Sequence, residues 1–275
     1  MRRIGAAALL VVLLAACASA GSTTGAPAEV RVLVFNIFAG KDTAGASNLE
    51  RVASLVRASD ADIVLLQEVD SVTRRSGGVD QPAVLASRTG YLAAFGSSLD
   101  YQGGEYGIAI LSRWPIASDS MVSLPITPPQ ARAGGSYEPR GALVVRIDAP
   151  GGRIAVINTH LDASGDDQYR RQELGTLLRL AREQLDAGMP VLVGGDFNSR
   201  PDSEVIRRAL ANGWLDLWME CGGSDAGNTY PAHAPIRRID YLFLASRGTC
   251  TDARVVGHGV SDHLGVLIDV RINAR

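Results

Sequence analysis

A short apolar stretch followed by two glycines and an acid constrains this chain more than any other feature. Residues 189–193 are typical of a buried strand, because the run is short, apolar and β-branched. Gly194-Gly195 allows a sharp turn at its end, and the proline and acids of 201–204 indicate a helix start. The turn therefore presents Asp196 and Asn198 at an exposed tip, where they can hold a water or a metal ion. A polar strand-to-helix loop is the alternative interpretation.

The same arrangement, a polar cluster at the end of an apolar strand, recurs along the chain. It occurs at Asn36, Glu68, 158–160, 196–198 and 261–263, and Asp240 stands at the start of a further strand. Strand ends carry sites in layered α/β folds, and so many acids, amides and histidines there are hard to explain by solvation alone. Strands and helical segments alternate, and strands outnumber helices. We therefore predict an α/β (α+β) fold, a four-layer α/β/β/α sandwich of two packed mixed sheets flanked by helices.

Hydrophobic periodicity places the individual elements. Strands are predicted at 29–35, 63–67, 107–112, 140–147, 154–159, 189–193, 238–244, 253–256 and 264–270. Helices are predicted at 49–58, 81–89 and 167–185, the last with an amphipathic leucine stripe. A hydrophobic content of 46% with 20% charged residues is sufficient for a sizeable core.

The N-terminus is interpreted as a targeting segment outside the fold. Arg2 and Arg3 precede an apolar run over residues 4–16 that is too short for a comfortable membrane span and matches a signal peptide. The run ends at Cys17 in a motif that resembles a bacterial lipobox, in which the cysteine is lipidated. A plain secretory signal with an incidental cysteine is the alternative.

The predicted organisation has three parts. Residues 1–16 form a signal peptide, residues 17–28 a lipid-anchored flexible tether, and residues 29–275 one domain. The expected location is the cell envelope, with the domain lipid-anchored to a membrane and facing the periplasm or the cell exterior.

The charge balance weakens duplex DNA as a dedicated partner without excluding it. The chain has 27 basic and 29 acidic residues, and removal of 1–16 takes away two arginines and no acids, so that 25 against 29 leaves −4. Nucleic-acid binders usually carry a basic face, whereas Arg170-Arg171 and Arg237-Arg238 are isolated pairs. A local positive patch around a site would escape this test.

Two cysteines remain once Cys17 is assigned to the lipid. Cys221 and Cys250 are an even pair in an oxidising compartment, which favours a disulfide between them. Two separately buried thiols are the alternative. No spacing of cysteine and histidine in the sequence indicates a structural zinc site.

Taken in order, the motifs at the strand ends resemble the endonuclease/exonuclease/phosphatase superfamily of deoxyribonuclease I-like metal-dependent phosphoesterases. The motifs are Phe35-Asn36-Ile37, Leu66-Gln67-Glu68, Gly107-Ile108-Ala109-Ile110-Leu111-Ser112, Asn158-Thr159-His160-Leu161, Gly195-Asp196-Phe197-Asn198, Arg238-Ile239-Asp240-Tyr241 and Ser261-Asp262-His263. The resemblance implies hydrolysis of a phosphate ester with Mg²⁺ or Mn²⁺. It also implies that Glu68 is the main metal ligand, with Asn36 and Asp262 near the metal, and such oxygen ligands suit a hard cation.

The resemblance further implies catalytic roles. His263 would be polarised by Asp240, and either His263 or Asp196 would take the proton from the attacking water. Asn198 and His160 would hydrogen-bond the phosphoryl oxygens.

Three more residues are implied as substrate or phosphate contacts. Arg140 stands where some members of the superfamily place a basic phosphate contact, with an ordinary strand-start arginine as the alternative. Glu105 or Tyr106 would contact His160 or the substrate.

The functional expectation is a monomeric Mg²⁺-dependent phosphodiesterase of the cell envelope, bound to the membrane through its N-terminal lipid. Its expected substrate is a phospholipid, a sphingolipid or a small phosphodiester. A secreted or periplasmic nuclease acting on DNA or RNA is the first alternative. A non-catalytic envelope lipoprotein that binds a ligand is the second, although every residue of the implied site is present.

Overall fold

The structure is a computed structural model that describes residues 28–128, 138–222 and 226–273. Its strands form two six-stranded mixed sheets. The first has the order β11(Gly248–Val256), β12(Gly265–Ile272), β1(Ala28–Asn36), β2(Ile63–Ser71), β4(Gly104–Ser112) and β3(Leu92–Tyr101). The second has the order β5(Ile116–Leu124), β6(Arg140–Ala149), β7(Gly152–His160), β8(Val191–Asp196), β10(Asp240–Leu244) and β9(Leu215–Asp216).

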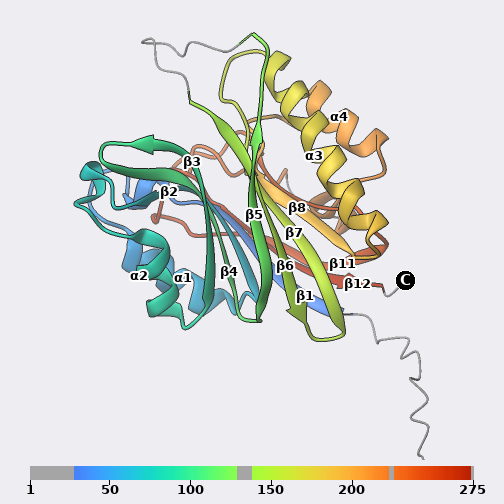
Figure 1. Ribbon diagram of the computed structural model, residues 1–275, viewed down its shortest axis with the longest axis horizontal. Helices are drawn as coiled ribbons and strands as arrows, with labels where there is room; N and C mark the ends of the chain where they lie inside the picture. The colour runs from blue at the N-terminus through green and yellow to red at the C-terminus, as the bar shows by residue number, and fades with distance from the viewer. Residues whose placement is uncertain (1–27, 129–137, 223–225, 274–275) are drawn as a thin grey trace, which may run out of the picture.

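The longer helices cover the outer faces of the two sheets. Helices α1(Leu49–Ser59) and α2(Gln81–Thr89) pack on the first sheet, and α3(Gln168–Asp186) and α4(Glu204–Ala211) pack on the second. Figure 1 shows the two helix pairs on opposite sides, with both sheets between them. The predicted four-layer α/β/β/α sandwich is confirmed. Three short helical segments complete the elements: η1(Phe38–Gly40), η2(Arg74–Ser76) and α5(Leu217–Glu220).

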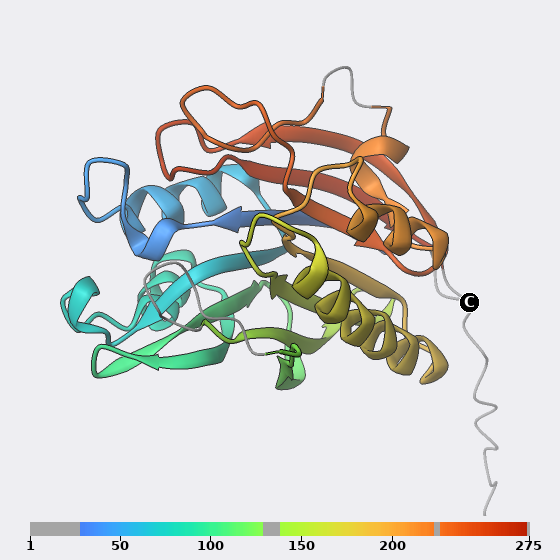
Figure 2. The same ribbon diagram turned by 90° about the horizontal axis from the view of Figure 1, so that it is seen from above.

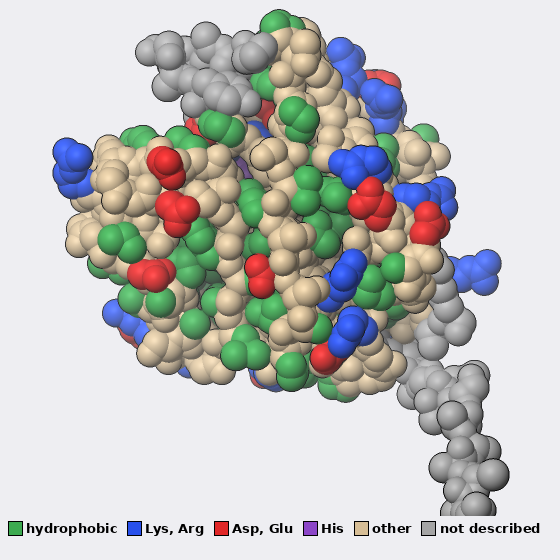
Figure 3. Space-filling view, viewed as in Figure 1, with side chains coloured by type: hydrophobic (Ala, Val, Ile, Leu, Met, Phe, Trp, Pro, Cys, Tyr) green, Lys and Arg blue, Asp and Glu red, His purple; other side chains and the backbone are tan. Residues whose placement is uncertain are grey.

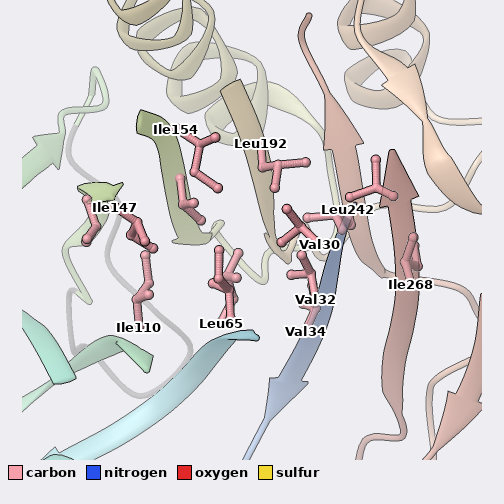
Figure 4. Packing of buried hydrophobic residues seen from close by; sticks show 14 of the residues in the cluster. Val30, Val32, Val34, Leu65, Ile110, Ile147, Ile154, Leu192, Leu242 and Ile268 are labelled. Carbon is pink, nitrogen blue, oxygen red and sulfur yellow. The ribbon is translucent and has the colours of Figure 1, made fainter. Parts of the chain in front are cut away.

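The core lies between the layers because successive strand side chains point to opposite faces. In β1, Val30, Val32 and Val34 pack between the sheets, whereas Leu33 and Phe35 pack beneath α1. Figure 4 shows the three valines facing side chains of the other sheet. Full burial of each such side chain stabilises the fold by about 1.5–3 kcal/mol.

Strand directions bring the polar strand ends together. β1 runs parallel to β2 in one sheet, and β7 runs parallel to β8 in the other. The register pairs His160 with Asp196, and Asp196 with Asp240 at the start of the antiparallel β10. In Figure 2 the red C-terminal strands lie beside the blue first strand, and β12 pairs antiparallel with β1.

Three strands that the sequence did not predict, β3, β5 and the two-residue β9, lie at sheet edges. β3 and β5 each end a sheet, and most of their side chains are exposed or half-buried. An edge strand packs on few neighbours, so it lacks the apolar run or alternation that periodicity detects. The edge strand β11 likewise begins at Gly248, five residues before its predicted start.

A disulfide joins α5 to the edge of the first sheet. Cys221, directly after α5, is bonded to Cys250 in β11, with Cα atoms 5.1 Å apart. The predicted signal peptide, the tether to residue 27 and the lipidated Cys17 lie outside the described residues. Within the described ranges, no helix combines the length and apolar character that a membrane crossing requires.

Candidate active site

The polar strand ends converge on one cleft of about 570 Å³. Of the predicted site residues, the cleft is lined by Glu68, Tyr106, Arg140, His160, Asp196, Asn198, Asp262 and His263. The side chains of Asn36 and Asp240 are buried and contact these residues directly. Glu105 is exposed and does not line the cleft, so Tyr106 is the member of that pair that the fold brings to the site. In Figure 3 a histidine lies within a hollow in the upper part of this face.

Asn36 at the end of β1 links two acids from different sheets. Its Nδ2 donates to Glu68 Oε1 and to Asp196 Oδ2, each at 3.2 Å. Its Oδ1 accepts from the backbone N–H of Phe38 at 3.0 Å. The carboxamide is therefore oriented as a donor that holds the two carboxylates next to each other.

Asp196 is the centre of the polar cluster. Its Oδ2 lies 3.5 Å from His160 Nε2 and 3.7 Å from His263 Nε2. Its Oδ1 accepts from the backbone N–H of Asn198 at 2.9 Å. The Asn198 side chain donates one amide hydrogen to the Leu161 carbonyl at 3.0 Å, and its second amide hydrogen is the one that a ligand oxygen could accept.

A carboxylate orients His263 on its opposite side. His263 Nδ1 lies 3.0 Å from Asp240 Oδ2 in a buried contact. The imidazole is thus held between two acids, with Nδ1 towards Asp240 and Nε2 towards Asp196. This is the arrangement of a histidine whose position and charge are fixed by a carboxylate partner.

Burial and charge set the protonation of this cluster. Burial, together with the negative charge of Asp240, raises the pKa of Asp196 to about 7. Burial alone would lower the pKa of His263, but the charges of Asp240 and Asp196 outweigh it and raise the pKa to about 10. Burial also raises the pKa of Glu68, opposed by the hydrogen bond from Asn36. Hence the site favours a cationic imidazole, and a further positive charge placed among its acids would be stabilised by their negative charge.

Two site residues occupy left-handed backbone conformations. Glu68 has φ +55° and Asn198 has φ +48°. Glu68 lies where the pairing of β2 with β4 shifts register, and such a bulge re-aims a side chain. A left-handed non-glycine residue costs about 1–3 kcal/mol, which the surrounding strands must offset.

Arg140 and Tyr106 form a second side of the cleft. Arg140 at the start of β6 is buried and pairs with Glu138, 2.6 Å from Nη1 to Oε1. Its buried Nε has no hydrogen-bond partner among the described residues. Burial and the neighbouring Glu68 charge raise the pKa of Tyr106 well above its usual value, so its hydroxyl remains a donor.

The structure also identifies residues that sequence reasoning missed. Tyr230 and Arg237 line the cleft from the chain before β10, and Arg75 lines it from η2. Tyr230 packs its ring 4.8 Å from the His263 ring. None of the three follows an apolar strand, and the only signal for Arg237 was its membership of an isolated basic pair.

Asn158 from the predicted histidine motif lies beneath the site instead of lining it. Gln67 Nε2 donates to its Oδ1 at 2.7 Å, and its Nδ2 donates to the carbonyls of Leu66 and Ala109 at 2.9 and 2.8 Å. This buried amide pair ties β7 to β2 and β4 across the two sheets. These hydrogen bonds join the end of β7 in the second sheet to β2 and β4 in the first.

The cluster contains groups suited to a divalent cation. Asp196, Asp240 and His263 are buried and offer ligand atoms within 4.8 Å of one another, so they could bind a metal ion. Asp240 Oδ1 is buried without a hydrogen-bond partner among the described residues. None of these three residues is among the predicted metal ligands, which are Glu68, Asn36 and Asp262. Within the group, His263 Nδ1 and Asp240 Oδ2 are already hydrogen-bonded to each other. The oxygen-rich donors of both sets fit a hard cation.

Comparison with known proteins places this site in a family. The sequence profile of the endonuclease/exonuclease/phosphatase family matches residues 33–263, and the chain belongs to that family. A solved structure described as the endonuclease/exonuclease/phosphatase from Bacteroides vulgatus superimposes with a TM-score of 0.71 at 21% identity, over 89% of this chain and 99% of that one. The chain thus has the sequence pattern of this family of phosphoesterases, and its fold matches that of the solved structure.

Curated relatives extend the comparison. The chain is 28% identical over 237 residues to the uncharacterized protein YbhP of Escherichia coli, covering 82% of this chain and 88% of YbhP. It is 32% identical over 144 residues to inositol phosphosphingolipids phospholipase C of Saccharomyces cerevisiae, covering 48% of this chain and 30% of that one. It is 23% identical over 185 residues to sphingomyelinase C of Listeria ivanovii, covering 59% and 52%.

Proposed function

We propose that the protein is a Mg²⁺-dependent phosphodiesterase of the cell envelope that hydrolyses a phospholipid, a sphingolipid or a small phosphodiester. The observation that carries this proposal is the placement of His263 between Asp240 and Asp196, in a cleft that also contains His160, Asn198 and Glu68. A site that only binds a ligand has no need for a histidine fixed by one carboxylate and directed at another.

Each residue of the cleft has a separate role in the proposed hydrolysis. His263, held by Asp240, is cationic and donates a hydrogen bond from Nε2 to the phosphoryl group. A protonated imidazole cannot accept another proton, so Asp196 is the group that accepts the proton of the attacking water. His160 and the second amide hydrogen of Asn198 donate to phosphoryl oxygens, whose charge grows in the transition state. Arg140 adds a buried cation on the other side of the cleft.

We propose that acidic side chains of the same cleft bind the cation. Glu68 and Asp262 would hold Mg²⁺, with Asn36 beside them as the donor that positions Glu68. When bound there, Mg²⁺ would supply Lewis-acid polarisation of the phosphate and stabilisation of the leaving oxygen. Mn²⁺, with similar oxygen preferences, is the alternative.

The substrate class rests on relatives and on charge. Two of the curated relatives carry the names of lipid phosphodiesterases, and the net charge of −4 without residues 1–16 does not favour a nucleic-acid partner. The proposed lipid anchor at Cys17 would keep a monomeric domain at a membrane, close to such substrates.

Product release from a substrate panel tests the activity. The full chain in detergent micelles, with Mg²⁺ or with EDTA, is given sphingomyelin, phosphatidylinositol, an aryl phosphodiester, plasmid DNA and RNA. We expect Mg²⁺-dependent cleavage of a lipid or of the aryl diester, abolished in His263→Ala. His258→Ala, a change at an exposed histidine outside the cleft, is the matched control and should retain activity.

The other outcomes separate the competing functions. Cleavage of nucleic acid with lipids untouched would replace the lipid proposal with a nuclease. Equal activity of the His263→Ala protein, if folded, would refute the mechanism. No cleavage of any substrate by the wild type would favour a binding lipoprotein.

A further inference from the structure

Among the described residues, three arginines line the cleft, and they differ in how their charge is compensated. Arg75 donates Nε and Nη2 to the buried Asp70 at 2.8 and 2.7 Å. Arg140 is paired with Glu138. Arg237 is exposed, and no carboxylate of the described residues forms an ion pair with it. Of these three charges, that of Arg237 is the one with no carboxylate partner in the parts of the chain that the structure describes, so it is available to a ligand.

The position of Arg237 relative to the reacting centre is fixed. Its guanidinium lies 5.9 Å from the centroid of the Tyr230 ring, which in turn lies 4.8 Å from the His263 ring. The backbones of Tyr230 and Arg237 exchange two hydrogen bonds, each of 3.0 Å. The Tyr230 ring thus lies close to both the Arg237 guanidinium and the imidazole.

The backbone bonds between Tyr230 and Arg237 close a hairpin, and this hairpin is hydrogen-bonded to the segment that contains His263. The N–H of Ala232 donates to the Asp262 carbonyl at 2.7 Å, and the N–H of Leu264 donates to the Thr229 carbonyl at 2.8 Å. Arg238, next along the chain, is buried and makes two bonds to Asp216, at 2.9 and 2.8 Å. Since its neighbour is anchored inward, Arg237 projects from a rigid base and not from a free loop.

The chemistry of the cleft limits what Arg237 can bind. One scissile phosphodiester carries a single negative charge, and Arg140, the histidines and the proposed cation already serve it. A guanidinium offers a planar fork of donors that matches a phosphate or carboxylate. A guanidinium that has no carboxylate partner among the described residues, at the side of such a cleft, fits a second anionic group on the same substrate.

We propose that Arg237, with the Tyr230 ring as its platform, forms a subsite for a second anionic group, such as a further phosphate on the headgroup of the substrate. This inference rests on the proposed function for the identity of the scissile group. It makes Arg237 a specificity-determining residue that favours phosphorylated headgroups over neutral ones. An adjacent nucleotide phosphate has the same chemistry and is the competing source.

Calorimetric binding of product-like probes tests the subsite without requiring turnover. The full chain in detergent with Mg²⁺ is titrated with inositol 1-phosphate and with inositol 1,4-bisphosphate. We expect the second phosphate to improve the affinity of the wild type about tenfold, which is what a charged hydrogen bond supplies. In Arg237→Gln this gain should disappear, and in Arg237→Lys it should be partly kept, because the charge remains and the fork is lost. Arg208→Gln, an exposed arginine of α4, is the matched control and should keep the whole gain.

Each remaining result decides against a defined part of the proposal. An equal gain in wild type and Arg237→Gln, no gain in the wild type, or no binding of either probe would overturn the subsite. Thymidine 5′-phosphate and thymidine 3′,5′-bisphosphate form a second pair, and a gain with this pair alone would overturn the headgroup assignment. If no lipid or aryl diester is hydrolysed but the Arg237-dependent gain remains, the proposed activity fails and the subsite stands.

Discussion

At the scale of single residues, the site depends on which groups are left to face the cleft. Glu68 and Asp196 could be predicted because each directly follows or ends an apolar strand, and register alone brings Asp196 beside His160 and Asp240. Arg237 could not be predicted in the same way. Its neighbour Arg238 is identical in type yet buried against Asp216, and only three-dimensional packing separates their roles.

The partner of His263 gives the first prediction. Asp240→Asn keeps the size of the side chain but removes the charge that holds the imidazole cationic and oriented. We expect kcat to fall by about 10²–10⁴-fold, the range in which an oriented acid–base histidine contributes. Steady-state kinetics on the substrate found by the panel measures it, with the exposed Asp119→Asn as control. A folded Asp240→Asn protein within a few-fold of wild type would remove Asp240 from the mechanism.

A buried acid outside the reaction predicts how stability varies with pH. Glu173 on α3 is buried, and its Oε2 accepts from the Asp162 N–H at 2.9 Å. Burial raises its pKa from 4.5 to about 7, so the folded protein binds this proton more tightly than the unfolded chain. The stability that Glu173 contributes is therefore complete below pH 4.5 and is lost as the pH rises through 7.

The variant Glu173→Gln removes this dependence. At pH 8 it should be more stable than wild type by up to about 3 kcal/mol, and at pH 4 the difference should vanish. Urea unfolding at both pH values measures it. Glu183→Gln, on the same helix but exposed and paired with Arg179, is the control and should change little at either pH. A Glu173→Gln protein that is less stable than wild type at pH 8 would show that the charged carboxylate is favourable where it lies.

At the scale of elements, strand pairing brings the polar groups of the site close together, with 3.5 Å between His160 Nε2 and Asp196 Oδ2. The inner strands were predictable because they are buried on both faces and read as apolar runs, as β8 does. The edge strands β3 and β5 were not, although β3 carries Leu99 and Tyr101 to the wall of the cleft. The periodicity of a sequence reports burial, so it finds the elements that build the core before those that border the site.

Gly195 in β8 is the element-scale position where substitution should do most damage. It has φ +139°, and an added Cβ would lie 1.9 Å from the Thr159 carbonyl oxygen of the neighbouring strand. We expect Gly195→Ala to lower the free energy of unfolding by at least about 3 kcal/mol, since strain and a backbone clash combine. It should also reduce activity, because the pairing of β7 with β8 sets the distance from His160 to Asp196.

A second glycine provides the matched control. Gly175 lies on α3, and an added Cβ there would meet no atom within 4 Å. Gly175→Ala should therefore stabilise the protein by about 0.5–1 kcal/mol, through the helix propensity of alanine. Denaturant unfolding of both variants compares them directly. Similar stability of the Gly195→Ala protein and wild type would mean that the β7–β8 pairing adjusts at little cost.

At the scale of the whole molecule, the sandwich is a frame that holds strand ends from two sheets against each other. The layers could be predicted from the sequence because the polar clusters recur at strand ends and because apolar strands and helices alternate. The cleft wall formed by Tyr230 and Arg237 could not, since it depends on a hairpin bonded to the segment that carries His263. The core elements were thus visible in the sequence, and the parts that we propose select the substrate became visible only in the fold.

The proposed anchor makes a prediction at this scale. If Cys17 carries the lipid, wild-type protein expressed in a bacterial host should sediment with membranes, and Cys17→Ser should move it to the soluble fraction. The catalytic cleft is built from residues 68–263, so hydrolysis of a water-soluble aryl phosphodiester should be equal in the two proteins. Hydrolysis of lipid in the host membrane should fall in the variant, because tethering raises the local concentration of enzyme at its substrate. Soluble wild-type protein, or membrane-bound Cys17→Ser whose residues 1–16 have been removed, would show that the cysteine is incidental.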